Sequence, residues 1–167
     1  MKNLLVMRHA KSSWKDNKLA DKDRPLNKRG KKDAPMMGKH IRARELLPQL
    51  ILCSSAERAR ATAKAVVDKS EYTGEVRYLD DLYLAELDCI LEVLHDLPED
   101  LDRVMVIGHN PGLESLVQIL SHQVDSLPTA AIAYLAIPID SWKDLKEDKD
   151  SQLVELWLPK DLRKSDK

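Results

Sequence analysis

The chain contains three short, continuous apolar runs that stop abruptly at polar or charged residues. Residues 4–9 (LLVMRH) and 104–109 (VMVIGH) each end in a histidine, and residues 50–53 (LILC) are followed by two serines. Short apolar runs bounded by turn residues are typical of strands that are covered on both faces. In open α/β sheets, ligands bind beyond the carboxyl ends of such strands. The pattern therefore predicts an α/β fold in which His9 and His109 lie at the same edge of the sheet.

Strand-like and helix-like segments alternate along the rest of the chain. This alternation predicts a three-layer α/β/α fold with a mostly parallel sheet, because parallel strands need crossover helices. Further strands are expected at residues 76–79, 130–137 and 152–158. Helices are expected after Asn27 and Ser55 as N-caps, over residues 87–97, and after Asn110 as an N-cap with Pro111 in the first helical position. Pro35 is expected to kink the first of these helices or to delay its start.

Three segments are expected to lie outside the regular elements. Residues 11–28 are too long and too charged for a simple turn, and they predict a functional loop or lid. Residues 140–150 have the composition of an exposed excursion. We expect one domain over residues 1–160 and a flexible tail over residues 161–167.

The charge balance argues against two broad classes of partner. Charged residues make up 33% of the chain but sum to a formal net charge of -1, so we expect neither nucleic-acid nor membrane binding. The sequence has no apolar run of about 18 residues and no signal peptide, which predicts a cytoplasmic protein. Cys53 and Cys89 lie within apolar segments and are expected to be buried free thiols. The run at residues 28–32 (KRGKK) is expected to be a solvated face or a guide for an acidic partner, and the protein is expected to be a monomer.

The residues at the predicted strand ends suit phosphoryl transfer. A neutral imidazole is a good nucleophile near neutral pH, so His9 could form a phosphoramidate that water later cleaves. Arg8, Arg58 and His109 could stabilise the charge on the phosphoryl oxygens. Arg58 belongs to the first turn of a predicted helix, where a cation opposes the helix dipole unless an anion is bound. The sequence has no glycine-rich phosphate loop and no metal-ligand spacing, so a metal-independent mechanism without a cofactor is expected.

Four motifs, in order within residues 1–138, resemble those of the histidine phosphatase superfamily. MRHA at residues 7–10 is similar to its Arg-His-Gly signature, and SSAERARATA at residues 54–63 is similar to its Ser-Pro-x-x-Arg-Ala-x-x-Thr-Ala segment. GHN at residues 108–110 is similar to its late Gly-His motif. With RPLNKRG at residues 24–30 and the short length, the chain is most similar to the SixA branch of phosphohistidine phosphatases. The resemblance implies a phosphoglycerate mutase-like fold.

The resemblance also implies a role for each of the four principal residues. It makes His9 the residue that is phosphorylated, and it makes Arg8, Arg58 and His109 the groups that bind the phosphoryl group. Without the resemblance, His109 could be a buried core histidine and Arg58 could simply cover a helix surface.

The early loop (residues 11–28) supplies two further candidates, and the sequence departs from the family pattern at two points. Asp21 and Arg24 match an Asp and an Arg that approach the site in the SixA branch, although they could also pair only with each other. Ala10 replaces the signature glycine. No clean proton-donor motif is present, so Asp21 and Glu86 are the candidate donors, and Glu86 could equally be a solvated residue at a helix start.

The missing donor favours one class of substrate. An imidazole leaves a phosphoryl group more easily than an alkoxide does, so it needs less help from a general acid. We therefore expect a phosphohistidine phosphatase that acts on a signalling or phosphocarrier protein through an intermediate on His9. The alternatives are a phosphomonoesterase of small phosphorylated metabolites, which needs a working proton donor, and a phosphate-sensing module without turnover.

Overall fold

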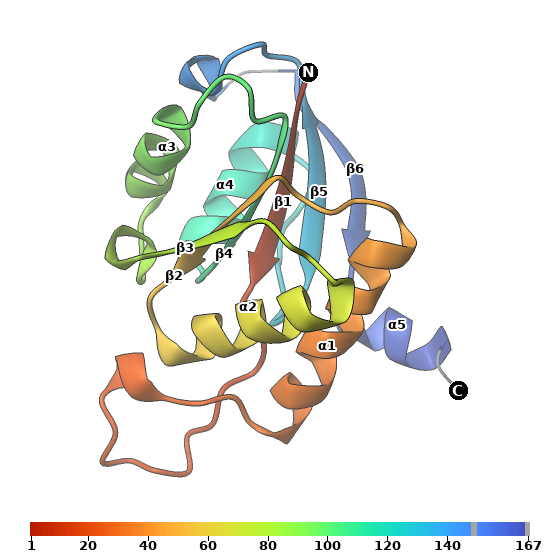
Figure 1. Cartoon of the computed structure of the whole chain (residues 1–167). Coiled ribbons are helices and arrows are strands. Elements are labelled where there is room, and N and C mark those ends of the chain that lie inside the picture. Colours follow the sequence, from red (N-terminus) through yellow and green to blue (C-terminus); the bar gives the residue numbers. More distant parts are fainter. Residues whose placement is uncertain (148–149, 166–167) are drawn as a thin grey trace.

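The alternating segments of the chain form a six-stranded sheet between two layers of helices, which confirms the expected fold class (Figure 1). The structure is a computed structural model and describes residues 1–147 and 150–165. The strands are β1 (Lys2–Arg8), β2 (Leu50–Ser54), β3 (Glu75–Leu79), β4 (Arg103–Gly108), β5 (Ile132–Ile137) and β6 (Gln152–Trp157). The α-helices are α1 (Lys28–Ala43), α2 (Glu57–Ser70), α3 (Leu87–His95), α4 (Gly112–Ser121) and α5 (Pro159–Ser165). Three short 3-10 helices are η1 (Asp21–Asp23), η2 (Asp80–Leu82) and η3 (Trp142–Asp144).

The strand order places β1 and β4 side by side in the middle of the sheet. The order is β3-β2-β4-β1-β5-β6, and β1, β2, β3 and β4 pair in parallel. β1 and β4 are in register, with Arg8 opposite Gly108, and the backbone N–H of His9 donates to the carbonyl of Gly108 at 3.0 Å. His9 and His109 therefore leave the sheet at neighbouring positions, as the apolar runs predicted.

The apolar runs are buried on both faces because helices cover both sides of the sheet. In β1, Leu4 and Val6 belong to the core under α3 and α4, whereas Leu5 and Met7 belong to the core under α1 and α2. Each of these side chains is fully buried. Figure 1 shows α1 and α2 together on one side, with α3 and α4 on the other. Because side chains pack on both faces of the strand, the strand cannot shift easily, and its carboxyl end has a fixed position.

β5 departs from the parallel arrangement. It pairs antiparallel with β1 and with β6. After α4, the chain returns to the carboxyl end of the sheet through an irregular segment that buries Val124 and Leu127. β5 then begins beside the end of β1, with Ile132 opposite Met7. The sheet is mostly parallel, as predicted, with this one reversed strand.

One predicted helix start is confirmed in its N-cap, and two differ in detail from their predictions. Asn27 caps α1 as expected, because its side chain accepts from the N–H of Gly30, and this strong cap starts the helix well before Pro35. Ser55 is not the N-cap of α2; Ala56 holds that position. Pro111 likewise precedes α4 as its N-cap and is not its first residue.

The side chain of Asn110 ties loops together and does not cap α4. Its Nδ2 donates to the Glu114 carboxylate at 2.5 Å and to the carbonyl of Leu127 at 2.8 Å. The predicted cap is therefore wrong, because the donor half of the amide holds the segment before β5 against the start of α4.

Three predictions of exposure or burial also need correction. In the expected excursion at residues 140–150, Trp142 is fully buried and donates from Nε1 to the carbonyl of Leu101, although residues 148–149 lie outside the described part. Cys53 is buried as predicted, but Cys89 is exposed because it lies on the outer face of α3. Where a flexible tail was expected, α5 extends to Ser165, and Arg163 pairs with buried Asp33; residues 166–167 lie outside the described part.

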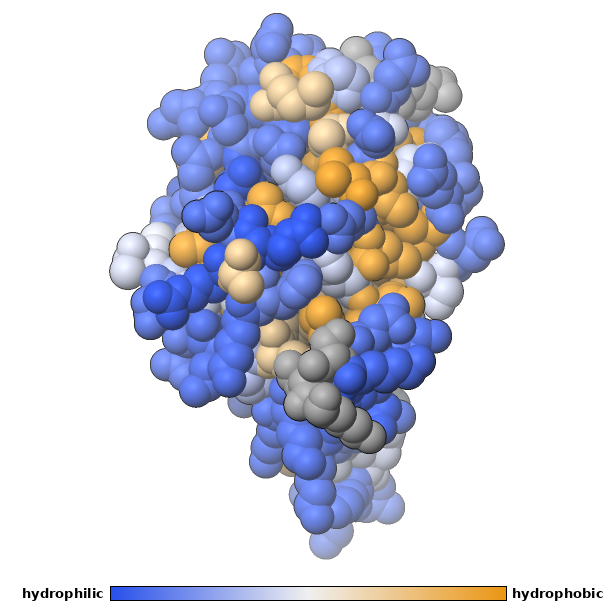
Figure 2. All heavy atoms as spheres, turned by 90° about the vertical axis from the view of Figure 1, so that its right-hand side faces the viewer, coloured by the Kyte–Doolittle hydropathy of each residue, from blue (hydrophilic) through white to orange (hydrophobic). Residues whose placement is uncertain are grey.

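The β6 edge of the sheet leaves apolar side chains accessible. Figure 2 looks onto this side of the molecule and shows hydrophobic residues gathered beside polar ones. Leu153, Leu156 and Leu158 are only partly buried against the core under α3 and α4, and Val154 is 43% exposed. Over residues 1–147 and 150–165, no helix is long and apolar enough to cross a membrane.

Candidate active site

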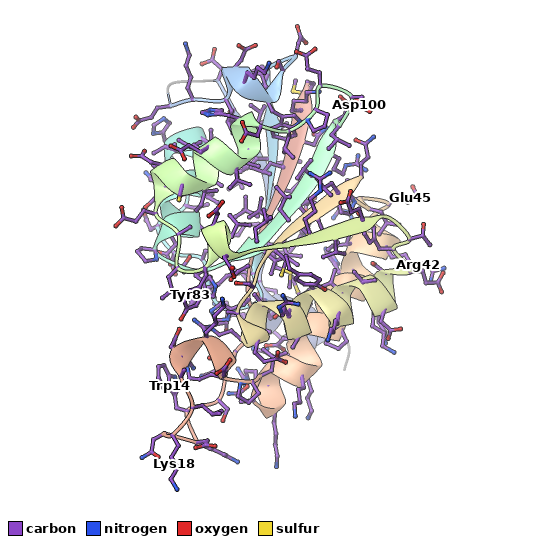
Figure 3. All side chains as sticks on the ribbon, turned by 60° about the vertical axis from the view of Figure 1, so that its left-hand side comes forward. Trp14, Lys18, Arg42, Glu45, Tyr83 and Asp100 are labelled. Carbon is purple, nitrogen blue, oxygen red and sulfur yellow. The ribbon has the colours of Figure 1, made fainter. Side chains whose placement is uncertain are left out.

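A pocket of about 360 Å³ opens beyond the carboxyl ends of β1 and β4. The early loop, the first turn of α2 and the segments that precede α4 and β5 surround it. Its lining residues are Arg8, His9, Lys11, Ser12, Trp14, Asp21, Arg24, Arg58, Leu84, His109, Asn110 and Thr129. Figure 3 shows Trp14 and Tyr83 at this end of the molecule, with Lys18 at the tip of the loop. The pocket brings together six of the seven site residues predicted from the sequence.

His9 is held in the form that a nucleophile requires. Its Nδ1 lies 2.7 Å from the carbonyl oxygen of Ala10, an acceptor, so Nδ1 carries the proton and Nε2 has the free lone pair. The side chain is almost buried, with 7% of the residue exposed. This burial, assisted by nearby Arg58 and Arg8, lowers the pKa of His9 to about 4. The imidazole is therefore neutral at physiological pH and can attack an electrophile through Nε2.

His109 faces His9 across the pocket and is polarised by two neighbours. The two ring centroids are 5.1 Å apart. Arg58 donates to Nδ1 of His109 at 3.4 Å, and Nε2 lies 2.7 Å from Oγ of Ser54. The resting ring therefore carries its proton on Nε2. Burial, together with the neighbouring His9 ring and the Arg58 guanidinium, lowers the pKa of His109 to about 3, so the resting pocket contains two neutral imidazoles.

Arg58 projects from the first turn of α2 and is fixed by Asp21. Its Nη1 donates to the backbone carbonyl of Asp21 at 2.7 Å, and its Nη2 lies 3.0 Å from the Asp21 carboxylate. The Nε atoms of Arg58 and Arg8 are buried without a hydrogen-bond partner among the described residues. Buried donors without a partner are uncommon, and they often occur at functional sites. Because both belong to residues that line the pocket, they favour an anionic ligand there.

Asp21 and Arg24 do pair with each other, but both also line the pocket. Arg24 donates to the Asp21 carboxylate from Nε and Nη2, at 3.2 and 3.1 Å, and to Oγ of Ser12 at 2.6 Å. The Tyr83 hydroxyl also donates to the Asp21 carboxylate. The Tyr83 hydroxyl and the two guanidinium groups lower the pKa of Asp21 to about 2. Asp21 is thus ionised at neutral pH and holds no proton to donate in the resting site.

The threonine of the second motif supports the segment that follows His9. The hydroxyl of Thr62 donates to the carbonyl of Arg58 at 2.7 Å and accepts from the backbone N–H of Ala10 at 2.9 Å. The carbonyl of this same Ala10 orients His9. One buried hydroxyl therefore links the backbone next to His9 to the helix turn that carries Arg58, which accounts for the spacing between the arginine and the threonine in the sequence.

Glu86 is the one predicted site residue that does not line the pocket. It is exposed at the N-cap of α3 and lines a separate hollow with other acidic residues of η2 and α3. The alternative given for it, a solvated residue at a helix start, describes its position. As a proton donor for this pocket, it has no support from its placement.

Three residues that touch the site residues had no predicted role. Tyr83 contacts Asp21 and stacks edge-on against His109, with ring centroids 5.5 Å apart. Trp14 covers the Arg24 guanidinium, whose carbon lies 3.5 Å from the ring centroid. Ser54 was visible as a polar residue at the end of an apolar run, but Tyr83 and Trp14 stand in segments without periodicity. Their positions depend on how the loops fold.

The described residues place three guanidinium groups and one carboxylate around the two histidines. This balance leaves the pocket cationic while both imidazoles are neutral. A tetrahedral oxyanion such as a phosphoryl group fits such a cluster, since guanidinium groups hydrogen-bond its oxygens in pairs. Among the residues that the structure describes, no group of three or more His, Cys, Asp or Glu side chains is arranged to hold a metal ion.

Known proteins resemble this chain in both sequence and fold. An uncharacterized chloroplastic protein of Arabidopsis thaliana is 34% identical over 152 residues, covering 86% of this chain and 70% of the relative. The crystal structure of a candidate phosphohistidine phosphatase SixA from Agrobacterium tumefaciens has a TM-score of 0.81 at 25% identity, covering 95% and 98% of the two chains. A candidate SixA from Nakamurella multipartitia has a TM-score of 0.78 at 27% identity, covering 95% and 96%.

A sequence model of the histidine phosphatase superfamily (branch 1) matches residues 4–89. This match contains the His9 and Arg58 motifs, and the structure adds His109 from beyond it. Phosphatase is the class of activity that the family and the SixA-like structures support. The chain belongs to the histidine phosphatase superfamily.

Proposed function

We propose that this protein is a phosphohistidine phosphatase that dephosphorylates a histidine of a signalling or phosphocarrier protein. The observation that carries the proposal is the state of His9, whose Nδ1 proton is bound by the Ala10 carbonyl and whose Nε2 is free in a cationic pocket. In the first step, Nε2 of His9 attacks phosphorus, and the P–N bond to the substrate imidazole breaks. In the second step, water attacks phosphorus, the P–N bond to His9 breaks, and inorganic phosphate leaves.

The Ala10 carbonyl supports both steps. When Nε2 bonds to phosphorus, the His9 ring gains positive charge, and the carbonyl stabilises this charge through the Nδ1 proton. Arg8, Arg58 and His109 line the pocket, and in this mechanism they bind the phosphoryl oxygens. The charge on the transferred group is therefore stabilised without a metal ion.

The candidate proton donors favour phosphohistidine over alkyl phosphates as the substrate, because neither is available in the pocket to protonate an alkoxide. A phosphorylated imidazole can leave as a neutral ring when its second nitrogen keeps a proton, whereas an alkoxide needs a proton from the enzyme. Asp21 is ionised, with a pKa of about 2, and Glu86 lies outside the pocket. Neither residue is placed and protonated as a donor for an alkoxide, which argues against the phosphomonoesterase alternative.

Kinetics on two substrates test the proposal. A peptide phosphorylated on histidine and a simple alkyl phosphate are compared at matched concentration, and we expect a kcat/KM at least about a hundredfold higher for the peptide, the usual contribution of a general acid. The wild-type protein should form an acid-labile, base-stable phosphoryl adduct. His9→Ala should abolish both the adduct and turnover, whereas the surface variant His122→Asn should retain them.

Three results would contradict parts of the proposal. Comparable turnover of alkyl phosphate, with a steep loss in Glu86→Gln, would restore the phosphomonoesterase alternative. Residual turnover in His9→Ala above about a hundredth of wild type would exclude the covalent route. Phosphate binding without any turnover would leave a phosphate-sensing module.

A further inference from the structure

A second hollow lies beside the candidate active site, and its polar lining is mainly cationic. It measures about 210 Å³ and shares Lys11 and Thr129 with the phosphate pocket. Its other lining residues are Arg29, Asp33, Pro128, Leu158, Pro159, Lys160 and Arg163. We call this the basic hollow. Residues from the early loop, α1, the segment before β5 and α5 meet there, so it is formed by the tertiary fold.

The basic hollow has an excess of positive charge. Its one carboxylate, Asp33, is buried and pairs with Arg163 at 2.6 Å. Lys11, Arg29 and Lys160 are exposed, and none of them has an ion pair within the described residues. Three cations thus face solvent next to a pocket that already contains three guanidinium groups.

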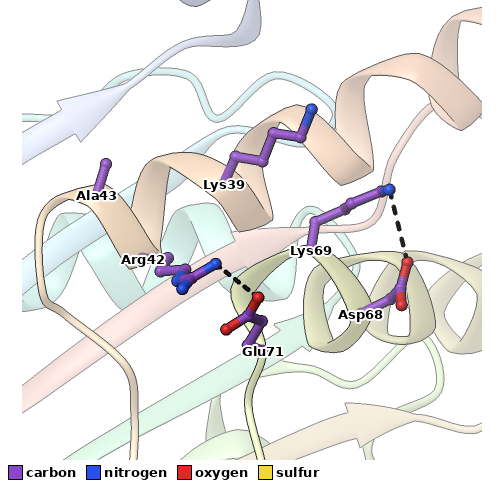
Figure 4. Close-up of a pocket in the computed structure, with 6 residues that line it drawn as sticks. All are labelled: Lys39, Arg42, Ala43, Asp68, Lys69 and Glu71. Carbon is purple, nitrogen blue, oxygen red and sulfur yellow. Dashed lines mark ion pairs between the residues drawn. The ribbon is translucent and has the colours of Figure 1, made fainter.

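Another hollow, which also contains residues of α1, shows that this excess of unpaired positive charge is not general on the surface. Figure 4 shows the hollow between the carboxyl-terminal parts of α1 and α2, which also contains three cations. There, however, Arg42 pairs with Glu71 at 2.8 Å, and Lys69 lies 3.8 Å from Asp68. Figure 3 places Arg42 far from Trp14 and Tyr83. Lys11, Arg29 and Lys160 thus lack the acidic partners that Arg42 and Lys69 have among the described residues.

We propose that the basic hollow binds carboxylate side chains of the phosphoprotein, in a segment close to its phosphorylated histidine. This inference rests on the proposed function and specifies the substrate further. A protein that places its phosphohistidine in the pocket must cover the shared rim at Lys11 and Thr129. An acidic segment next to the phosphohistidine would then meet the unpaired cations.

The form of the surface favours a polypeptide over a small molecule with two phosphates. The cations extend from exposed positions, whereas a small ligand is normally held by a few convergent groups in a closed pocket. Pro128, Leu158 and Pro159 add apolar surface to the hollow. At the mouth of the phosphate pocket, Trp14 is 74% exposed and Leu84 is 53% exposed. Exposed apolar groups beside a charged patch are typical of a protein interface.

Peptides with one phosphohistidine and different flanks test the inference. One peptide has Asp and Glu on one side of the phosphohistidine, a second has Asn and Gln at the same positions, and free phosphohistidine serves as the minimal substrate. We expect wild type to prefer the acidic peptide by about tenfold in kcat/KM at low salt, the sum of two exposed ion pairs. The preference should fall as salt is added, since exposed charges are screened.

Variants that reverse charge test whether the preference for the acidic peptide arises in the basic hollow. In the double variant Arg29→Glu/Lys160→Glu, the preference for the acidic peptide should disappear, while turnover of free phosphohistidine should stay within about twofold of wild type. The matched control is Lys39→Glu/Lys69→Glu, which changes the net charge equally in the hollow of Figure 4. The control should keep the preference, so that a general effect of net charge is separated from binding in the basic hollow.

The outcomes separate this inference from the proposed function. If wild type hydrolyses free phosphohistidine but shows no preference for the acidic peptide, or if the double variant keeps the preference, the basic hollow does not bind the substrate. If inorganic pyrophosphate instead inhibits wild type and not the double variant, without any peptide preference, the occupant is a small molecule with two phosphates. If neither free phosphohistidine nor either peptide is hydrolysed, the proposed function itself fails.

Discussion

Arg58 donates an N–H to Nδ1 of His109 across 3.4 Å, so the guanidinium group and the imidazole are in direct contact in the pocket. This contact leaves the imidazole without a proton on the side that faces Arg58. When a phosphoryl group binds, its negative charge raises the proton affinity of His109 and competes for the same guanidinium. The two residues should therefore act on the phosphoryl oxygens as a coupled pair.

A double-mutant cycle measures this coupling. Arg58→Ala and His109→Ala should each lower kcat on a phosphohistidine peptide by on the order of 10²-fold, the scale for one preorganised donor. The double variant should lose much less than the product of the two effects, because each single change already disrupts the pair. Arg60→Ala is the control, since Arg60 is on the same helix but does not line the pocket. Strictly multiplicative losses would show that the two residues act independently.

Acid should destabilise the fold through the two pocket histidines. Their pKa values are about 4 and about 3 in the folded protein, below the ordinary value of 6.5. The unfolded chain therefore binds protons first, and the stability gained above pH 6.5 is lost as the pH falls toward these lower values. For His9 alone, the loss between pH 7.5 and pH 5 should be about 2 kcal/mol. Urea unfolding at the two pH values should show a smaller loss for His9→Gln than for wild type.

The Asp21 carboxylate should contribute to activity by holding Arg24 and Arg58 in place through hydrogen bonds. Asp21→Asn replaces an oxygen that accepts from Arg58 or Arg24 by a donor, and we expect kcat/KM on phosphohistidine to fall by about tenfold to a hundredfold. Tyr83→Phe removes one donor to the same carboxylate and should cost less. A proton-donor role predicts a different pattern, with a loss on alkyl phosphate far larger than the loss on phosphohistidine.

Gly30 should be intolerant of a side chain because α1 passes close to the segment after His9. An added Cβ would lie 2.2 Å from the carbonyl oxygen of Lys11. Helix propensity alone favours alanine by up to about 1 kcal/mol, but overpacking against backbone costs about 1–3 kcal/mol. We expect Gly30→Ala to lower the free energy of unfolding. Gly108→Ala is the comparison, since its added Cβ meets nothing nearer than Leu113 at 3.7 Å, and its unfolding midpoint should change less.

Chelators should leave turnover unchanged. The mechanism assigns the stabilisation of phosphoryl charge to guanidinium groups that the pocket already holds. Dialysis against EDTA followed by assay on a phosphohistidine peptide checks this, with added Mg²⁺ or Zn²⁺ in parallel samples. Loss of activity in EDTA that a divalent ion restores would require a metal-assisted step.

The strands, and the principal residues that the structure brings together in the pocket, could be predicted because they depend on local patterns. A strand buried on both faces needs an unbroken apolar run, and its end is marked by the first polar residue, which identified His9 and His109. Arg58 was identifiable because a cation in a first helical turn needs an anion nearby. Each of these arguments uses a few neighbouring residues, and the parallel sheet then brings the three groups together.

The parts that could not be predicted depend on contacts between distant segments. The direction of β5 follows from the path of the chain after α4, and an apolar strand pattern is the same in either direction. Trp142 stands among charged residues in the sequence, and its burial depends on packing in the core under α3 and α4 and on the carbonyl of Leu101, which accepts from its Nε1. Tyr83 contributes to the site because η2 lies next to the early loop, a contact that no periodicity encodes. Glu86 illustrates the reverse case, since closeness to site residues in sequence does not place it in the pocket.

The in-register pairing of β1 with β4 limits which parts of the site can vary during evolution. The backbone spacing between His9 and His109 is set mainly by hydrogen bonds between two adjacent strands. Loops around the pocket that do not contact His9 or His109 can therefore lengthen, shorten or exchange residues while the two histidines keep their backbone spacing. Deleting a single residue from β1 would instead shift His9 by about 3.3 Å along the sheet and turn its side chain to the other face. New substrate preferences can thus arise by loop variation alone, with the chemistry held constant by the sheet.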